Sequence, residues 1–132
     1  MARRVIKQSV VLAASAESLY ATYMDPARHA AITVGKVVIS ARAGSKFSAF
    51  DGTLWGTTLA AVRPRLVVQS WRSKNFLATD PDSTLILSFV PDGVQGRIEL
   101  VHLDVPKQDF AGVWEGWETY YWAPWRAFLA RR

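Results

Sequence analysis

Gly112 to Leu129 reads GVWEGWETYYWAPWRAFL and holds four of the six tryptophans of this 132-residue chain. At a period of 3.6 residues, its aromatic side chains fall on one side of a helix. That row consists of Trp114, Trp117, Tyr121, Trp125 and Phe128, widened by Trp122 and Leu129. The opposite side carries Glu115, Gly116, Thr119, Ala123, Arg126 and Ala127. The segment therefore predicts a terminal helix whose broad aromatic face is covered by a large element.

Two residues depart from the helical pattern. Pro124 lacks a backbone donor and is expected to kink or tighten the helix. Glu118 falls among the aromatic side chains and has no Lys or Arg four residues away. An unpaired buried carboxylate is costly. Glu118 therefore either reaches solvent, pairs with an arginine such as Arg72 or Arg97, or contacts a ligand at a cavity mouth.

Upstream of this helix, the sequence alternates with the period of β-strands. A first strand is expected at residues 4–12, followed by two short helices capped by Ser15 and Asp25. Six further strands are expected at 36–41, 46–50, 53–62, 66–72, 83–90 and 96–104, with Asp51-Gly52 as the clearest hairpin turn. Seven antiparallel strands followed by a long helix predict an α+β fold, with the helix packed on one face of a curved sheet.

Alternation also predicts which strand residues face this helix. Three sets each share one face: Leu85, Leu87 and Phe89; Ile98, Leu100 and His102; and Val67, Gln69 and Trp71. We expect all three sets to point inward.

Length and composition favour one globular domain over residues 1–132. The chain has no cysteine, which excludes disulfides and thiol catalysis, and it has no apolar run long enough for a membrane span or a signal peptide. We therefore expect a cytoplasmic protein. The net charge is +5, but apart from four arginines at the two ends, 12 basic residues stand against 11 acidic ones. This balance argues against nucleic-acid binding.

Several motifs together resemble a known family. They are Phe47-Ser48-Ala49-Phe50-Asp51-Gly52 with Gly56, Val68-Gln69-Ser70-Trp71-Arg72, Asp82-Ser83, His102-Leu103-Asp104-Val105-Pro106, and Gly116-Trp117-Glu118-Thr119-Tyr120-Tyr121-Trp122. In this order they are similar to the activator of heat-shock protein 90 ATPase homologue family, within the START-like superfamily. The resemblance runs from about Gln8 to Leu129. It implies a helix-grip fold whose cavity, between sheet and helix, binds apolar or amphipathic molecules in many members.

Titratable residues offer few sites for catalysis. His102 lies on the inward side of its strand, where it is either a hydrogen-bonded core residue or a polar group in the cavity. His29 is expected on a short exposed helix. Two histidines without cysteine or metal-ligand spacing predict no metal site, and no motif predicts a cofactor. No nucleophile motif or carboxylate pair is present either, although the superfamily includes acid/base enzymes.

The sequence thus leads to one main hypothesis and two alternatives. The main hypothesis is non-catalytic binding of a small hydrophobic or amphipathic ligand between helix and sheet. The expected contact residues are Trp71, Phe89, His102, Trp117, Glu118, Tyr121 and Trp125. The first alternative, implied by the resemblance alone, is interaction with a chaperone such as heat-shock protein 90. The second alternative is an acid/base enzyme of the same superfamily.

Overall fold

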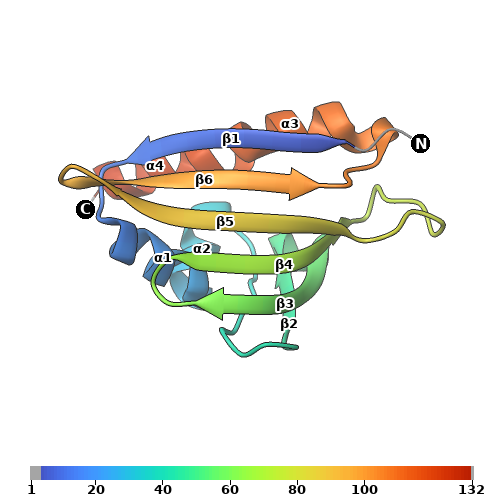
Figure 1. The fold of residues 1–132 in the computed structure, drawn as a ribbon, viewed down its shortest axis with the longest axis horizontal. Helices are drawn as coiled ribbons and strands as arrows, with labels where there is room; N and C mark the ends of the chain where they lie inside the picture. The colour runs from blue at the N-terminus through green and yellow to red at the C-terminus, as the bar shows by residue number, and fades with distance from the viewer. Residues whose placement is uncertain (1–3, 132) are drawn as a thin grey trace.

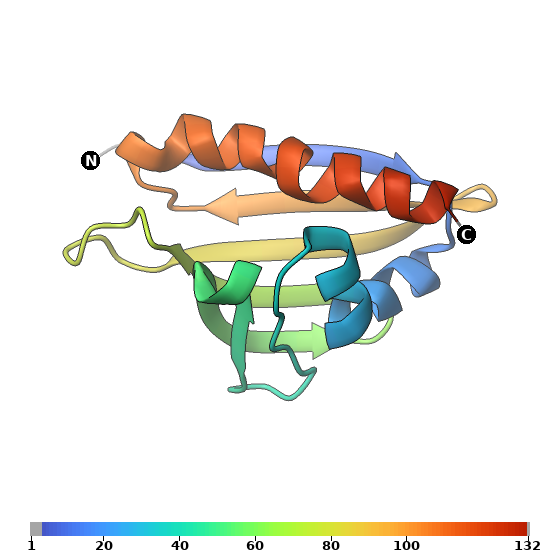
Figure 2. The same cartoon turned by 180° about the vertical axis from the view of Figure 1, so that it is seen from behind.

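The computed structural model describes residues 4–131, which form an antiparallel sheet with all helices on one of its faces (Figures 1 and 2). Six strands pair in the order β1-β6-β5-β4-β3-β2. The strands are β1 (Val5–Leu12), β2 (Lys46–Ala49), β3 (Leu54–Val62), β4 (Leu66–Ser73), β5 (Ser83–Asp92) and β6 (Gln95–Leu103). The α-helices are α1 (Ala16–Met24), α2 (Pro26–Thr33), α3 (Phe110–Trp117) and α4 (Ala123–Ala130). This arrangement confirms the α+β helix-grip prediction.

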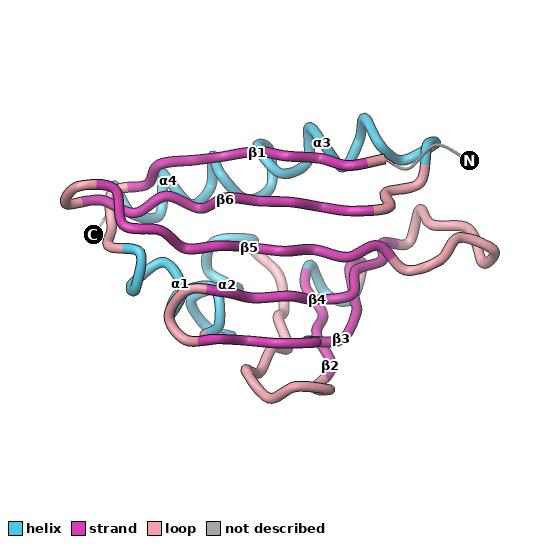
Figure 3. Tube along the Cα trace, in the orientation of Figure 1, coloured by secondary structure: helices cyan, strands magenta, loops and turns pink. Residues whose placement is uncertain are grey.

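The expected strand at residues 36–41 is absent, so the sheet has six strands rather than seven within the described residues. Only Val38 bridges to the sheet, through two backbone hydrogen bonds with Ser48. Other backbone groups of this segment bond elsewhere: the amide of Lys36 donates to the Asp51 carboxylate, and Ser40 takes part in a local turn with Ser45. These competing bonds prevent a continuous ladder (Figure 3).

The inward faces of the strands agree with the predicted alternation. All nine residues of the three sets are buried, with exposed fractions of 4 % or less: Val67, Gln69, Trp71, Leu85, Leu87, Phe89, Ile98, Leu100 and His102. They form the floor on which the helices pack. The prediction that Trp71 points inward is therefore confirmed.

The two short helices also begin where their caps predict. The Ser15 hydroxyl accepts the amide of Ser18 at the start of α1, and the Asp25 carboxylate accepts two amides at the start of α2. Pro26 occupies the first turn of α2, where a missing donor is harmless. No helix within residues 4–131 is long and apolar enough to cross a membrane.

The terminal helix widens ahead of Pro124 instead of tightening. A π-helical turn, η3 (Glu118–Trp122), separates α3 from α4, and the amide of Ala123 donates to the carbonyl of Glu118 five residues earlier. Pro124 has no amide to continue the ordinary pattern, which explains a wide turn here. Such a turn accommodates one extra residue and shifts the following side chains by about 100° around the axis. Trp117, Tyr121, Trp122 and Trp125 are all buried, as the aromatic row predicts, whereas Trp114, expected in the same row, is 43 % exposed.

Candidate functional site

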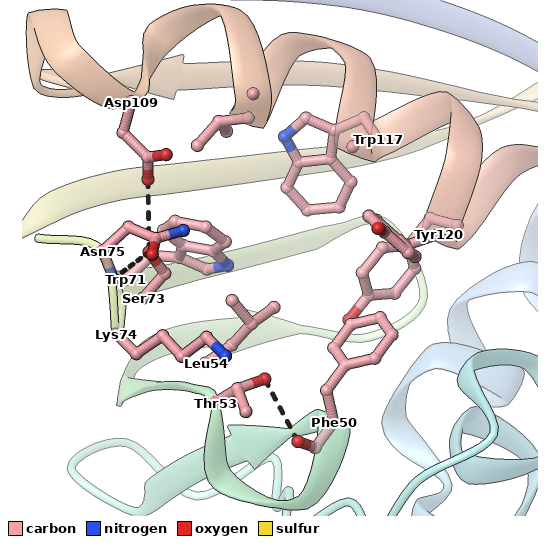
Figure 4. Close-up of a pocket in the computed structure, with 14 residues that line it drawn as sticks. Phe50, Thr53, Leu54, Trp71, Ser73, Lys74, Asn75, Asp109, Trp117 and Tyr120 are labelled. Carbon is pink, nitrogen blue, oxygen red and sulfur yellow. Dashed lines mark hydrogen bonds between the residues drawn. The ribbon is translucent and has the colours of Figure 1, made fainter.

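A cavity of about 420 Å³ lies between the start of the terminal helix and the sheet. Figure 4 shows Trp117 extending from the helix into this space, Asp109 directed at Ser73 at one end, and Phe50 on the opposite side. Five aromatic residues form one wall: Phe50, Trp71, Trp117, Tyr120 and Tyr121. Polar side chains gather at one end: Thr53, Ser73, Lys74, Asn75 and Asp109. Leu54, Gly112, Val113 and Gly116 complete the lining. The cavity is thus amphipathic, with an aromatic body and a polar end.

The five aromatic rings touch one another in an unbroken series. The ring centroids lie 6.4 Å apart between Trp71 and Trp117, and 4.9 Å apart between Trp117 and Tyr121. Phe50 continues the series, at 5.7 Å from Tyr121 and 5.9 Å from Tyr120, in edge-to-face geometry. These distances are those of favourable aromatic pairs, so the wall is a cooperative unit.

A buried histidine holds the central tryptophan of this wall. The indole N–H of Trp117 donates to Nδ1 of His102 over 3.3 Å, and the other ring nitrogen of His102 lies 2.9 Å from the Ser83 hydroxyl. Because that hydroxyl donates to the carbonyl of Trp71, it accepts from His102, which fixes a neutral imidazole protonated on Nε2. Burial lowers the pKa of His102 to about 3, consistent with this neutral form.

A second buried histidine holds Tyr121. His29 Nδ1 lies 2.8 Å from the carbonyl of Tyr23 and therefore donates to it, which leaves Nε2 to accept the Tyr121 hydroxyl over 2.9 Å. Burial lowers the pKa of His29 to about 4, although the bond to the Tyr23 carbonyl opposes this shift, and burial raises the pKa of Tyr121. The expectation that His29 is exposed is wrong: its helix packs against the terminal helix, and the side chain is 1 % exposed.

Two glycines of the terminal helix leave the cavity open. Gly112 and Gly116 both line it, one helical turn apart. A Cβ atom on either would approach other atoms no closer than 3.5 Å, and neither has a positive φ, so neither packing nor backbone conformation requires glycine. In a helix, glycine costs about 1 kcal/mol relative to alanine. Gly116, predicted on the side opposite the aromatic row, instead lies beside it.

Asp109 places a carboxylate at the polar end of the cavity. It stands at the N-cap of α3 but makes no capping bond; its Oδ2 instead accepts the Ser73 hydroxyl over 3.2 Å (Figure 4). Partial burial raises the pKa of Asp109, the Ser73 bond opposes that rise, and the nearby charge of Asp80 adds to it. Asp109 is a site residue that the sequence analysis missed, because nothing in the sequence distinguishes it from an ordinary helix cap.

The predicted contact residues divide into three groups. Trp71, Trp117 and Tyr121 line the cavity. His102 lies behind Trp117, and Phe89 and Trp125 are buried in the core away from the lining. Glu118 lies on the other side of the helix, in a shallow groove next to β1. The structure therefore brings three of the seven together around one space.

Glu118 pairs with Arg126 over 2.8 Å, rather than with Arg72 or Arg97, which bond to other acidic residues. Two side chains eight residues apart do not lie on the same side of a regular helix. The π-turn between Glu118 and Arg126 takes up one extra residue, so the two are spaced as if they were seven residues apart, which is nearly two full turns. Both side chains are at least half exposed. Glu118 is thus not enclosed by the aromatic rings that surround it in the sequence pattern.

We expect Glu118→Gln to change the free energy of unfolding by less than about 0.5 kcal/mol, since exposed ion pairs contribute little. Urea denaturation of the two proteins measures this. A loss of more than about 1.5 kcal/mol would contradict the surface role that the geometry assigns to the pair.

Within residues 4–131, no three His, Asp or Glu side chains lie close enough together to hold a metal ion. Among the described residues, Asp109 and Lys74 are the only charged groups that line the cavity. Its chemistry is therefore that of apolar contact, hydrogen bonding and two opposite charges near one end.

Comparison with known proteins identifies the family. The family model described as "Activator of Hsp90 ATPase homolog 1-like protein" matches residues 13–128. The chain belongs to this family. An uncharacterized protein of Schizosaccharomyces pombe is 36 % identical over 67 residues, which are 51 % of this chain and 20 % of that protein. The chain thus matches only a fifth of the length of that relative.

Solved structures share the fold of this family member at low sequence identity. An HSP90 activator from Plasmodium falciparum has a TM-score of 0.85 at 18 % identity, with 96 % of each chain covered. A protein from Mesorhizobium loti has a TM-score of 0.82 at 16 % identity, covering 97 % of this chain and 98 % of the other. The Aha1 dimer from Colwellia psychrerythraea has a TM-score of 0.78 at 14 % identity, covering 94 % and 95 %. These similarities establish the helix-grip fold.

Proposed function

We propose that this protein, acting as a single domain, binds a small hydrophobic or amphipathic molecule in the cavity between α3 and the sheet, without catalysing a reaction. The observation that carries this proposal is the pair of helical glycines, Gly112 and Gly116. Glycine lowers the stability of a helix, and no close contact at these two positions requires it. The absence of side chains here leaves an open space bounded by aromatic rings. The buried histidines behind Trp117 and Tyr121 support it further, because they hold the wall in place before a ligand arrives.

The first test compares the native and denatured masses of the purified protein to detect a bound occupant. An NMR titration with neopentylbenzene, an uncharged apolar probe, then follows the backbone amides. We expect shifts concentrated at Phe50, Trp71 and residues 112–121. Shifts spread over the surface, without a bound mass, would overturn the proposal.

A cavity-filling variant separates binding from folding. We expect Gly116→Leu to weaken binding of the probe at least about tenfold while leaving the protein as stable or more stable, because leucine favours the helix and fills the space. Ala111→Leu is the matched control: it adds the same side chain to an exposed position of α3 outside the cavity. Equal binding by both variants would show that the probe binds elsewhere.

A second candidate function is interaction with a chaperone. The family description, together with the HSP90 activator of similar fold, supports this candidate. Stimulation of ATP hydrolysis by heat-shock protein 90 would support it, whereas neither stimulation nor complex formation would exclude it.

A further inference from the structure

The polar end of the cavity carries a carboxylate with no cation bound to it. Within residues 4–131, ion pairs join Arg72 to Asp82, Arg97 to Asp92 and Glu99, and Arg126 to Glu118. Asp109 belongs to none of these pairs. Its bond from Ser73 engages Oδ2, whereas no group of residues 4–131 donates a hydrogen bond to Oδ1, which lies 3.5 Å from the Cβ position that Gly112 leaves empty. A partly buried carboxylate without a cation favours a positive charge beside it.

The rest of the lining has the same preference. The faces of aromatic rings carry partial negative charge, and rings that surround a cation bind it more tightly as the site loses water. Here five rings in mutual contact, from Trp71 through Trp117 and Tyr121 to Phe50 and Tyr120, bound the space that Asp109 closes. Such rings and a carboxylate together make a site for an alkylammonium group.

Lys74 is the one charged lining residue, among those described, whose charge would disfavour a cationic ligand. Its side chain lines the cavity but is exposed, and it lies too far from Asp109 to form an ion pair. A lysine on a flexible stem keeps its ammonium in water at little cost. Asp80, which acts on Asp109 through its charge, adds to the negative potential at this end. Lys74 is therefore the more exposed of the two charged groups at the polar end, and Asp109 is the partly buried one.

We propose that the ligand of this cavity is a cationic amphiphile: an apolar or aromatic body that lies along the five rings, with a substituted ammonium group at the polar end next to Asp109. This inference rests on the proposed function, since it names the class of molecule that the same cavity takes. No bond is made or broken, and Asp109 contributes its charge.

Three probes of matched shape test the charge preference: benzyltrimethylammonium (cationic), neopentylbenzene (neutral) and benzylsulfonate (anionic). Titrations followed through the indole N–H resonances of Trp71 and Trp117 give their dissociation constants. We expect the cation to bind about tenfold to thirtyfold more tightly than the neutral probe, and the anion most weakly. Equal binding of the cation and the neutral probe would overturn the inference and leave the cavity function standing. Binding of none would overturn both.

Isosteric variants identify the group responsible. Asp109→Asn is expected to reduce the advantage of the cation over the neutral probe about fivefold to tenfold, without changing binding of the neutral probe. Glu115→Gln is the matched control, because it removes the same charge from the same helix outside the cavity. Tighter binding of benzylsulfonate that is lost in Lys74→Gln would instead identify an anion site and overturn the inference.

A measurement on the unaltered protein gives the same answer independently. Affinity for the cation is expected to fall as the pH drops through the pKa of Asp109, because protonation removes the attracting charge, while affinity for neopentylbenzene stays constant over that range. Asp80 is the other acid acting at this end. Parallel profiles for the two probes would contradict a role for Asp109.

Discussion

Lowering the pH from 7 to 5 is expected to reduce the free energy of unfolding by about 4 kcal/mol, through His29 and His102. In the unfolded chain a histidine titrates near pH 6.5, whereas in the fold burial lowers the two pKa values to about 4 and about 3. Between these limits the unfolded state binds more protons than the folded state. The contribution of the two neutral histidines to the free energy of unfolding is therefore fully present above about pH 6.5 and is lost as the pH falls toward 4.

Urea denaturation at pH 7, 6 and 5 measures this effect. Each histidine is expected to account for about half of it, so His29→Gln and His102→Gln should each remove about half of the pH dependence. This range lies above the titration of most carboxyl groups, which separates the histidines from general acid unfolding. A flat profile, or one that neither variant changes, would contradict the neutral buried state of the two rings.

Protonation of either histidine within the folded protein, which burial delays to about pH 4 for His29 and about pH 3 for His102, is expected to disturb the cavity wall. A proton on Nδ1 of His102 displaces the Trp117 indole donor, and a proton on Nε2 of His29 displaces the Tyr121 hydroxyl donor. Both rings belong to the aromatic wall. Stability and the shape of the binding wall therefore depend on the same two imidazoles, although they lie on α2 and β6, far apart in the sequence.

Local patterns in the sequence predicted most of the fold. Alternation in β4, β5 and β6 identified every buried residue of the three inward sets, and the caps Ser15 and Asp25 fixed the starts of two helices. The prediction of a strand at 36–41 was wrong because strand propensity does not indicate which group a backbone amide will hydrogen-bond to. In this case the partner of Lys36 is the Asp51 side chain, fifteen residues away.

The site was harder to predict than the fold because it depends on contacts between distant parts of the chain. A regular 3.6-residue period correctly places Trp122 and Trp125 on the buried face, but it also places Trp114 there and Gly116 opposite, whereas Trp114 is exposed and Gly116 lines the cavity. Pro124 indicated a disturbance but not its sense, since a missing donor is compatible with a kink or a wider turn. Asp109 could not be identified either, because its role follows from a contact with Ser73 across the fold.

Gly56→Ala is expected to lower the free energy of unfolding by about 3 kcal/mol, in contrast to substitution of the cavity glycine. A Cβ atom at Gly56 would overlap the carbonyl oxygen of Ser70 and lie 2.6 Å from its carbon, both backbone atoms of the neighbouring strand β4. Backbone cannot rotate away as a side chain can, so β3 would have to separate from β4. β2, which pairs with β3, leads directly into Phe50 in the cavity wall, so binding should weaken together with stability.

Gly116→Ala is the matched control for this prediction. The nearest side-chain atom to a Cβ at this position belongs to Tyr120 at 3.5 Å, an ordinary contact, so the helix should gain about 1 kcal/mol. Urea denaturation of both variants decides the outcome. A change at Gly56 within about 0.5 kcal/mol of zero would mean that the two strands separate easily, and a loss at Gly116 would mean that the cavity is not open there. If replacing glycine by alanine destabilises the protein at position 56 and stabilises it at position 116, the two glycines have different roles. The first allows two strands to approach, and the second leaves room for a ligand.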